Sequence, residues 1–172
     1  MKEHDPRCED ADDAKLLADV KEHGWHVVKI LDMDELPGWA FSIGLYKNFG
    51  HPEIIVFGLD LDVMHFLINT IGDKVKAGKK FEIDGQYADL VETYACTFKP
   101  VKQKWYDAFL GYANWFYDGV DYPVVQCVWP DKDHRYPWES NFNPHWVSAQ
   151  PLLFHEDTEK ARATELLQSL ED

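Results

Sequence analysis

The chain has 172 residues and a mass of 20.0 kDa, the usual size of a single domain. Its 17 basic and 31 acidic residues leave a net charge of −14, which disfavours nucleic acid and anionic lipid, because both recruit Lys and Arg. No apolar run can span a bilayer, and the polar start MKEHDPRCEDADD has no signal-peptide core. Cysteines at positions 8, 96 and 127 make neither a disulfide framework nor a CxxC metal motif. We therefore expect a reduced, cytoplasmic domain that binds neither nucleic acid nor membrane.

The first third of the chain predicts one helix and three strands. A helix is expected over about residues 9–22, where apolar residues recur at helical spacing before Gly24. Strands are expected over 25–31, 39–46 and 53–59, which are rich in β-branched and aromatic residues. The last of these strands is largely apolar, as is typical of a strand buried on both faces.

The middle of the chain predicts a second helix and two strands. An apolar stripe runs along residues 61–77, and Gly78 is well placed to end that helix. Residues 81–83 alternate with charged neighbours, as in an edge strand, before the turn signal Asp84-Gly85. Residues 91–101 alternate well and form the next expected strand.

The last third combines an aromatic helix, a strand and a long loop. A helix is expected over 103–117, a strand over 122–129, a loop over 130–151 and a final helix over 157–170. Five residues of the first helix share one face: Trp105, Phe109, Tyr112, Ala113 and Phe116. Further rings lie on its other faces, so this helix is either buried between two layers or presents rings to a partner.

The order of elements is α-β-β-β-α-β-β-α-β-loop-α, in which several strands follow one another without a helix between them. Such strands form hairpins, so the sequence predicts an α+β fold with a mainly antiparallel sheet or half-open barrel and flanking helices. We expect one domain over residues 1–172, with an acidic helix at 9–22, a core at 24–153 and a C-terminal helix at 157–170.

Catalytic and metal-binding patterns are weak in this sequence. No HExxH or Cys/His spacing marks a metal site, and no glycine-rich phosphate loop is present. A small hydrolase would have to use His51, Cys127, Asp131 or His134, although Cys127 lies in an apolar strand typical of an inert thiol. We therefore expect no catalytic residue, metal or cofactor.

A second alternative is a cofactor-binding protein. The order of strands and helices is loosely similar to that of flavin-binding split barrels, and Lys79, Lys80 and the many rings could hold a flavin. This is an analogy at the level of the fold, and no phosphate-binding signature supports it.

The loop from Trp129 to Glu139 mixes rings, both signs of charge and two prolines. Proline fixes φ and reduces the entropy lost on ordering, so this loop can be preorganised without regular structure. Loops of this length are usually functional or disordered, and the aromatic content argues against disorder. The loop either covers the sheet or binds a partner.

Three blocks of sequence resemble the bacterial family Domain of Unknown Function 4262, over roughly residues 12–153. The blocks are FSIGL at 41–45 with NFGHPE at 48–53, LGYANWFY at 110–117, and PVVQCVWPD at 123–131 with PW at 137–138. The resemblance implies a small bacterial cytosolic protein and brings no settled catalytic residues. Some such acidic proteins accompany polymorphic toxins as immunity partners, and the resemblance implies that setting here.

Charge, surplus rings and resemblance together predict a non-enzymatic immunity protein that neutralises a basic toxin by covering its active site. The alternatives are the flavin-type cofactor-binding protein and the small hydrolase. The residues expected to contact the partner are Tyr106, Trp115, Tyr117, Asp131, Asp133, His134, Tyr136, Trp138 and Glu139.

Overall fold

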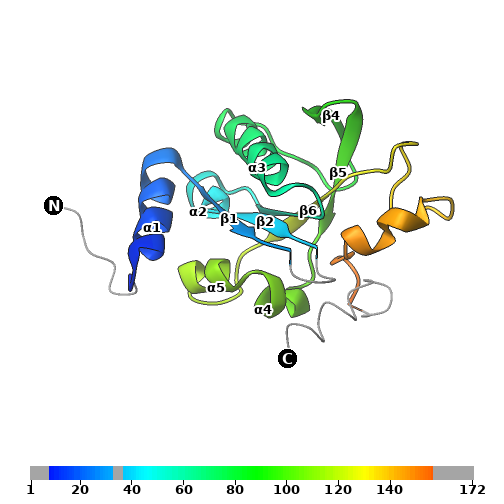
Figure 1. Ribbon diagram of the computed structural model, residues 1–172. Coiled ribbons are helices and arrows are strands. Elements are labelled where there is room, and N and C mark those ends of the chain that lie inside the picture. The colour runs from blue at the N-terminus through cyan, green and yellow to red at the C-terminus, as the bar shows by residue number, and fades with distance from the viewer. Residues whose placement is uncertain (1–7, 33–36, 157–172) are drawn as a thin grey trace.

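The computed structural model describes residues 8–32 and 37–156. Six strands form one open sheet in the order β1-β2-β3-β6-β5-β4, with helices on both of its faces (Figure 1). The strands are β1 (His26–Ile30), β2 (Trp39–Ile43), β3 (Glu53–Phe57), β4 (Gln86–Val91), β5 (Tyr94–Pro100) and β6 (Val124–Val128). β1 and β4 are the two edges, so the expected α+β sheet is present and it remains open.

Neighbouring strands are antiparallel except at the centre, where β3 and β6 run parallel. The antiparallel pairs follow from the hairpins that the sequence predicts. The parallel pair joins strands separated in sequence by α3, β4, β5, α4 and α5, and the sequence pattern contains no signal for it. It places the start of β3 beside the start of β6, with Glu53 opposite Val124.

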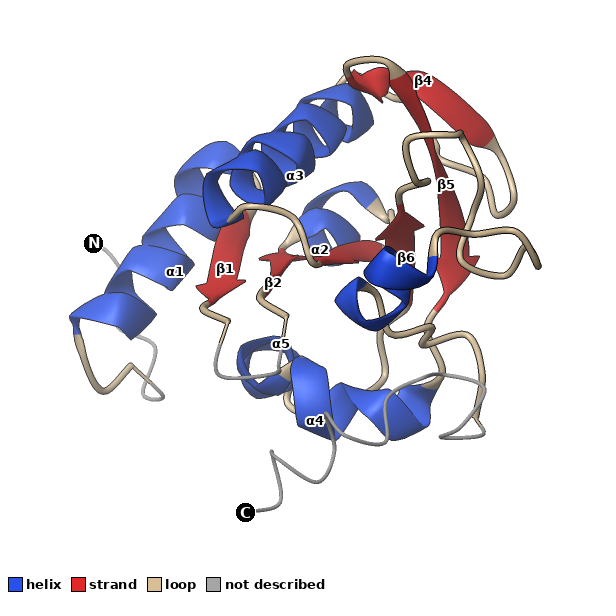
Figure 2. Cartoon of the chain, turned by 45° about the vertical axis from the view of Figure 1, so that its right-hand side comes forward, coloured by secondary structure: helices blue, strands red, loops and turns tan. Residues whose placement is uncertain are grey.

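Helices cover both faces of the sheet (Figure 2). α3 (Leu61–Lys76) and the short α2 (Leu45–Phe49) pack on one face. α4 (Tyr106–Phe109) and α5 (Gly111–Tyr117) pack on the other, preceded by a 3-10 turn at Gln103–Trp105. α1 (Ala11–His23) lies beside β1, and a second 3-10 turn, Pro144–Ala149, belongs to the long loop.

Each face of the sheet has its own hydrophobic core. On β2, Trp39, Phe41 and Ile43 point towards α4 and α5, whereas Ala40 points towards α3. All five residues of β2, β3 and β6 are buried, which explains why these strands are largely apolar, with one buried polar residue in each: Ser42, Glu53 and Gln126. α3 approaches β1 closely at Gly72, where an added Cβ would lie 2.5 Å from the Trp25 ring.

Two expectations about the strands are wrong. Residues 81–83 do not form a strand, because the Phe81 amide donates to His51 Nε2 (3.2 Å) and a turn follows with Asp84 at φ +64°. The strand that pairs with β5 is instead β4, which is mostly exposed and has no clear alternation. The strand expected over 39–46 also ends early, because its last two residues, Leu45 and Tyr46, begin α2.

The expected single helix over 103–117 is broken. Leu110 leaves the helical conformation at φ −126°, ψ 32°, so that it ends α4 and begins α5. The Asn114 side-chain amide donates to the Tyr106 carbonyl (3.1 Å). The same carbonyl also accepts from the Leu110 amide (2.9 Å), so the backbone remains hydrogen-bonded at the break.

The expected helix over 157–170 lies outside the described residues. In the described ranges, no helix combines the length and apolar character needed to cross a membrane. α1, α3 and the strands between them otherwise agree with their predicted positions to within a few residues.

Candidate functional site

The loop that follows β6 is organised around Asp131. Its Oδ1 accepts hydrogen bonds from the amides of Asp133 (2.9 Å) and Arg135 (3.0 Å), and its Oδ2 accepts one from the amide of Asn143 (2.9 Å). Asp131 is itself only 3 % exposed. This residue, expected to contact a partner, instead fixes the backbone on which other residues are displayed.

Trp138 is the main exposed ring of this loop, at 39 % exposure. It stacks on Tyr136 with 5.1 Å between ring centroids, and Lys99 Nζ lies 4.7 Å from its ring centroid. The buried Tyr136 hydroxyl donates to the Ala95 carbonyl (2.7 Å). Asp133, His134 and Glu139 of the same loop are also exposed.

The rings expected on the aromatic helix have different environments. Tyr106 is 2 % exposed and donates its hydroxyl to the Tyr122 carbonyl (2.8 Å), so it belongs to the core and cannot anchor a partner. Tyr117 is half-buried and donates to Glu53 Oε1 (2.6 Å). Trp115 is half-buried and lines a groove on the surface.

The structure therefore separates the predicted contact residues into two surfaces. α5 packs against β2, whereas the 131–139 loop contacts β5 through Tyr136 and the Tyr94–His134 ring pair (Figure 1). A single patch containing all of the predicted residues does not exist.

The groove that Trp115 lines has a volume of about 490 Å³. We call it the acid–aromatic groove, and its lining residues are Glu9, Asp10, Asp13, Gly111, Tyr112 and Trp115. Asp10 Oδ1 accepts from the Asp13 amide and Asp13 Oδ2 accepts from the Glu9 amide, both at 2.9 Å. These bonds cap α1 and hold two carboxylates in place beside the rings.

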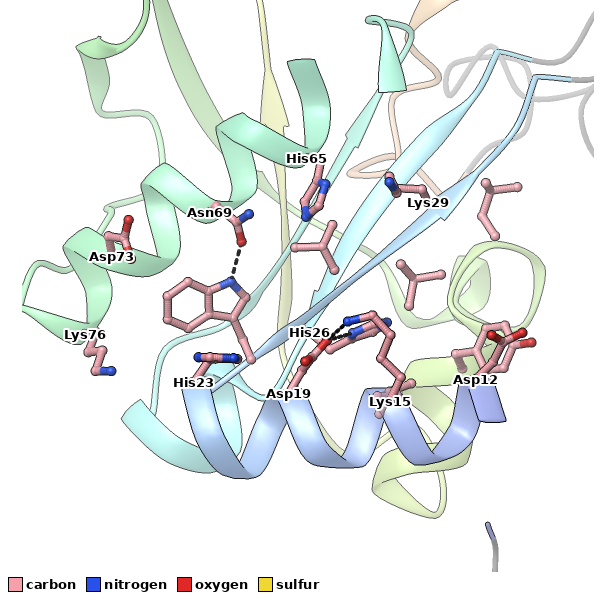
Figure 3. Close-up of a pocket in the computed structure, with 16 residues that line it drawn as sticks. Asp12, Lys15, Asp19, His23, His26, Lys29, His65, Asn69, Asp73 and Lys76 are labelled. Atoms are coloured by element: carbon pink, nitrogen blue, oxygen red, sulfur yellow. Dashed lines mark hydrogen bonds and ion pairs between the residues drawn. The ribbon is translucent and has the colours of Figure 1, made fainter. Parts of the chain in front are cut away.

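A larger groove, of about 730 Å³, lies between α1 and α3 with β1 along its floor (Figure 3). We call it the edge groove. Polar residues of α1 and α3 form its walls, and the residues from Trp25 to Ile30 line it continuously. The wall residues include Asp12, Lys15, Asp19 and His23 of α1, and His65, Asn69, Asp73 and Lys76 of α3. They recur at helical spacing, a signal that the sequence contains and that our sequence analysis did not use.

The α1 wall of the edge groove carries an ion-pair cluster. Asp19 Oδ2 lies 2.7 Å from His26 Nδ1 and 2.9 Å from Lys15 Nζ. Burial raises the pKa of the Asp19 carboxyl, but the hydrogen bonds and charges of Lys15 and His26 outweigh burial and lower it overall. The cluster holds the Nδ1 edge of the His26 ring against Asp19 and pairs Lys15 with the same carboxylate.

The α3 wall carries hydrogen-bond donors. The Trp25 indole donates to Asn69 Oδ1 (2.9 Å), which orients the Asn69 amide so that its NH₂ group remains a donor. Burial and the nearby charge of Lys29 lower the pKa of His65. Lys29 is exposed and lies beside His65 in Figure 3.

A buried carboxyl lies under α2 and α5. Glu53 is 0 % exposed, and its Oε1 accepts from the Gly44 amide (2.7 Å), the Tyr46 amide (3.2 Å) and the Tyr117 hydroxyl (2.6 Å). Its Oε2 accepts from the Ser42 hydroxyl (2.6 Å). Burial raises the pKa of Glu53 to about 7, against the lowering effect of these bonds.

Two of the residues weighed for a hydrolase, His51 and Cys127, are held in structural roles. His51 is buried, with Nδ1 against the Pro52 carbonyl (2.8 Å) and Nε2 accepting from the Phe81 amide. Cys127 is fully buried, and contact with Cys96 together with burial raises the pKa of its thiol well above the ordinary value. Within residues 8–32 and 37–156, no three His, Cys, Asp or Glu side chains are grouped to hold a metal ion.

Comparison with known families gives one match. The family described as domain of unknown function (DUF4262) matches residues 19–143, which include the α3 wall and the floor of the edge groove, Glu53 and the 131–139 loop. Neither the curated proteins nor the solved structures contain a match to this chain. The match covers most of the chain, and the protein therefore belongs to the DUF4262 family.

Proposed function

We propose that this protein is a non-enzymatic binding protein that recognises a basic protein, and that it serves as an immunity protein by covering the active site of a toxin. The observation that carries this proposal is the acid–aromatic groove, where three carboxylates surround two rings. A Lys or Arg side chain fits such a site, because carboxylates pair with its charge while ring faces attract it through cation–π contact.

The surroundings of the groove favour binding to a basic surface. The net charge of −14 speeds encounter with a positively charged partner. Tyr112 is 45 % exposed, and exposed rings are common anchors of protein interfaces. Because Asp10 and Asp13 are already fixed by capping bonds, they lose little further freedom when a partner binds.

The proposed setting is the bacterial cytoplasm. All three cysteines, Cys8, Cys96 and Cys127, are free thiols, as is usual in a reducing compartment. An immunity protein works beside the toxin that it blocks, so the natural candidate for the partner is the product of a neighbouring gene.

The test is a titration of the purified protein against the enzyme encoded by the neighbouring gene, with complex formation and enzyme inhibition measured separately. We expect a stoichiometric complex with Kd of about 1 nM or below, which corresponds to roughly −12 kcal/mol. Glu9→Gln and Tyr112→Ala should each weaken binding at least ten-fold. Both side chains are on the surface, so neither change should disturb the core.

The matched control is Trp138→Ala, which removes an exposed ring on the other surface. It should leave the affinity unchanged. The proposal fails if the enzyme is not inhibited at micromolar concentrations, or if Trp138→Ala abolishes binding while both groove variants bind normally.

A further inference from the structure

β1 has one edge that pairs with no other strand of the described chain. β1 pairs with β2 on one side only and is an end strand of the sheet. In the described part of the chain, no hydrogen bond connects its outer edge to any other segment. In an antiparallel strand, alternate residues direct their N–H and C=O groups to this outer side, where they can pair with another strand.

This edge is recessed between two helices. The edge groove has α1 and α3 as walls and the five residues of β1 as its floor (Figure 3). Five residues of a strand span about 16 Å. Val28 packs with the core under α1, and Val27 packs with the core under α3. Side chains of a strand added to β1 would therefore alternate between the two helical walls.

The charge of the groove differs from that of the whole molecule. Its lysines and aspartates balance: Lys15, Lys29 and Lys76 against Asp12, Asp19 and Asp73. The whole chain, by contrast, has 17 bases and 31 acids. On the α1 wall, Asp19 Oδ2 is already engaged by Lys15 Nζ and His26 Nδ1. Lys29 on the floor, and His65 and the Asn69 amide on the α3 wall, offer donors to an acceptor in the groove.

We propose that the edge groove binds an extended segment of a partner protein as an added strand on β1, with an acidic side chain of that segment facing Lys29 and His65. Backbone hydrogen bonds would supply affinity, and the walls would select side chains, as in other cases of strand addition. A second copy of this chain fits less well, because each copy would bring its own α1 and α3 walls against those of the other.

This inference goes beyond the proposed function, and Tyr112 is the single lining residue that the two grooves share. The acid–aromatic groove binds basic side chains, whereas the edge groove binds a backbone and an acidic side chain. Glu9 lines the first groove only, and Lys29 lines the second only. Failure of one proposal can therefore be recognised without the other.

The test uses synthetic peptides of seven residues in which valine alternates with glutamate. Binding is followed by chemical-shift changes and by amide exchange in the ¹⁵N-labelled full chain. We expect shifts concentrated at His26–Ile30 and slower exchange of β1 amides. The matched peptide with lysine in place of glutamate should bind at least ten-fold more weakly, and a peptide with every amide N-methylated should not bind.

Two protein variants separate local from general charge effects. Lys29→Glu should weaken binding of the glutamate peptide at least ten-fold. Lys102→Glu makes the same change of charge at an exposed site outside the groove and should have little effect. The proposal is wrong if the N-methylated peptide binds as well as the unmodified one, or if the two variants have equal effects. It is also wrong if sedimentation shows that the protein dimerises through β1.

Discussion

At the scale of single residues, Glu53 is the least expected feature of the core. It is fully buried, and its hydrogen-bond partners are four uncharged donors from β2, α2 and α5 and the residue between β2 and α2. The Ser42 hydroxyl that donates to Glu53 also accepts from the Ile54 amide (2.9 Å). This carboxyl thus joins the end of β2, the start of β3 and a helix more than sixty residues away.

The raised pKa of Glu53 predicts a dependence of stability on pH. The folded protein holds the proton up to about pH 7, whereas the unfolded chain releases it near 4.5. Below pH 4.5 both states are protonated, and the contribution of Glu53 to the free energy of unfolding is then at its highest. It falls as pH rises from 4.5 to about 7, by about 3 kcal/mol in all, and changes little above that.

The measurement is urea unfolding of wild type and Glu53→Gln between pH 4.5 and 8. Glutamine can keep an acceptor towards Gly44, Tyr46 and Tyr117 and place its NH₂ near Ser42, but it does not titrate. The free energy of wild type minus that of the variant should fall with pH. A difference that stays constant or rises would show that Glu53 has no raised pKa.

Asp131 predicts a second effect at this scale. Asp131→Ala leaves three backbone amides of the loop without their acceptor and should cost about 1–3 kcal/mol of stability. Hydrogen exchange should accelerate at the amides of Asp133, Arg135 and Asn143. Asp133→Ala removes an exposed carboxylate from the same loop and should leave that exchange unchanged.

At the scale of elements, α1 depends on its first turn. Asp10 is the N-cap, and its side chain accepts from the Asp13 amide. Asp10→Ala should lower the free energy of unfolding by about 1 kcal/mol. Asp12→Ala removes the same charge from the first turn but no capping bond, so chemical denaturation should show a smaller loss. Equal losses would mean that charge alone, and no cap, stabilises this turn.

The periodicity of apolar residues predicts some helices better than others. α3 has a regular apolar stripe, and six of its residues are buried against the sheet: Met64, Leu67, Ile68, Ile71, Gly72 and Val75. The region 103–117 has an equally regular face, yet it breaks at Leu110. Four residues of that face, Trp105, Phe109, Ala113 and Phe116, remain buried after the break, whereas Tyr112 becomes exposed.

At the scale of the whole molecule, the net charge of −14 predicts a response to salt. Repulsion among surface acids lowers stability, and salt screens it as the Debye length falls from about 30 Å at 0.01 M to about 8 Å at 0.15 M. The midpoint of urea unfolding should therefore rise over this range. The rise should shrink in Glu22→Lys and Glu92→Lys, which reverse exposed acids. A midpoint independent of salt would contradict the prediction.

The overall arrangement also explains why the predicted contact residues did not form one patch. Trp115 and Trp138 come from segments only about twenty residues apart in sequence. β6 runs between these segments, so they leave the sheet at opposite ends of a central strand. Proximity in sequence therefore says little about proximity on the surface.

The sequence by itself determined the elements whose burial is periodic or continuous: α1, α3, β1, β2, β3, β5 and β6. It also determined the α+β class, because successive strands without helices must form hairpins. The family could be recognised from short blocks, one of which contains both Ser42 and Glu53. Each of these conclusions depends on interactions between residues close together in the chain or on the composition of one segment.

Only the tertiary structure decided the grooves, the Glu53 network and the parallel β3–β6 pair. Glu53 and Tyr117 are 64 residues apart, and Trp25 and Asn69 are 44 residues apart. No local pattern specifies such pairs, because a side chain records whether it is buried and not which distant segment covers it. The edge groove exists because α1 and α3 lie on either side of β1. In the described chain, β1 pairs with β2 along one edge and with no other strand.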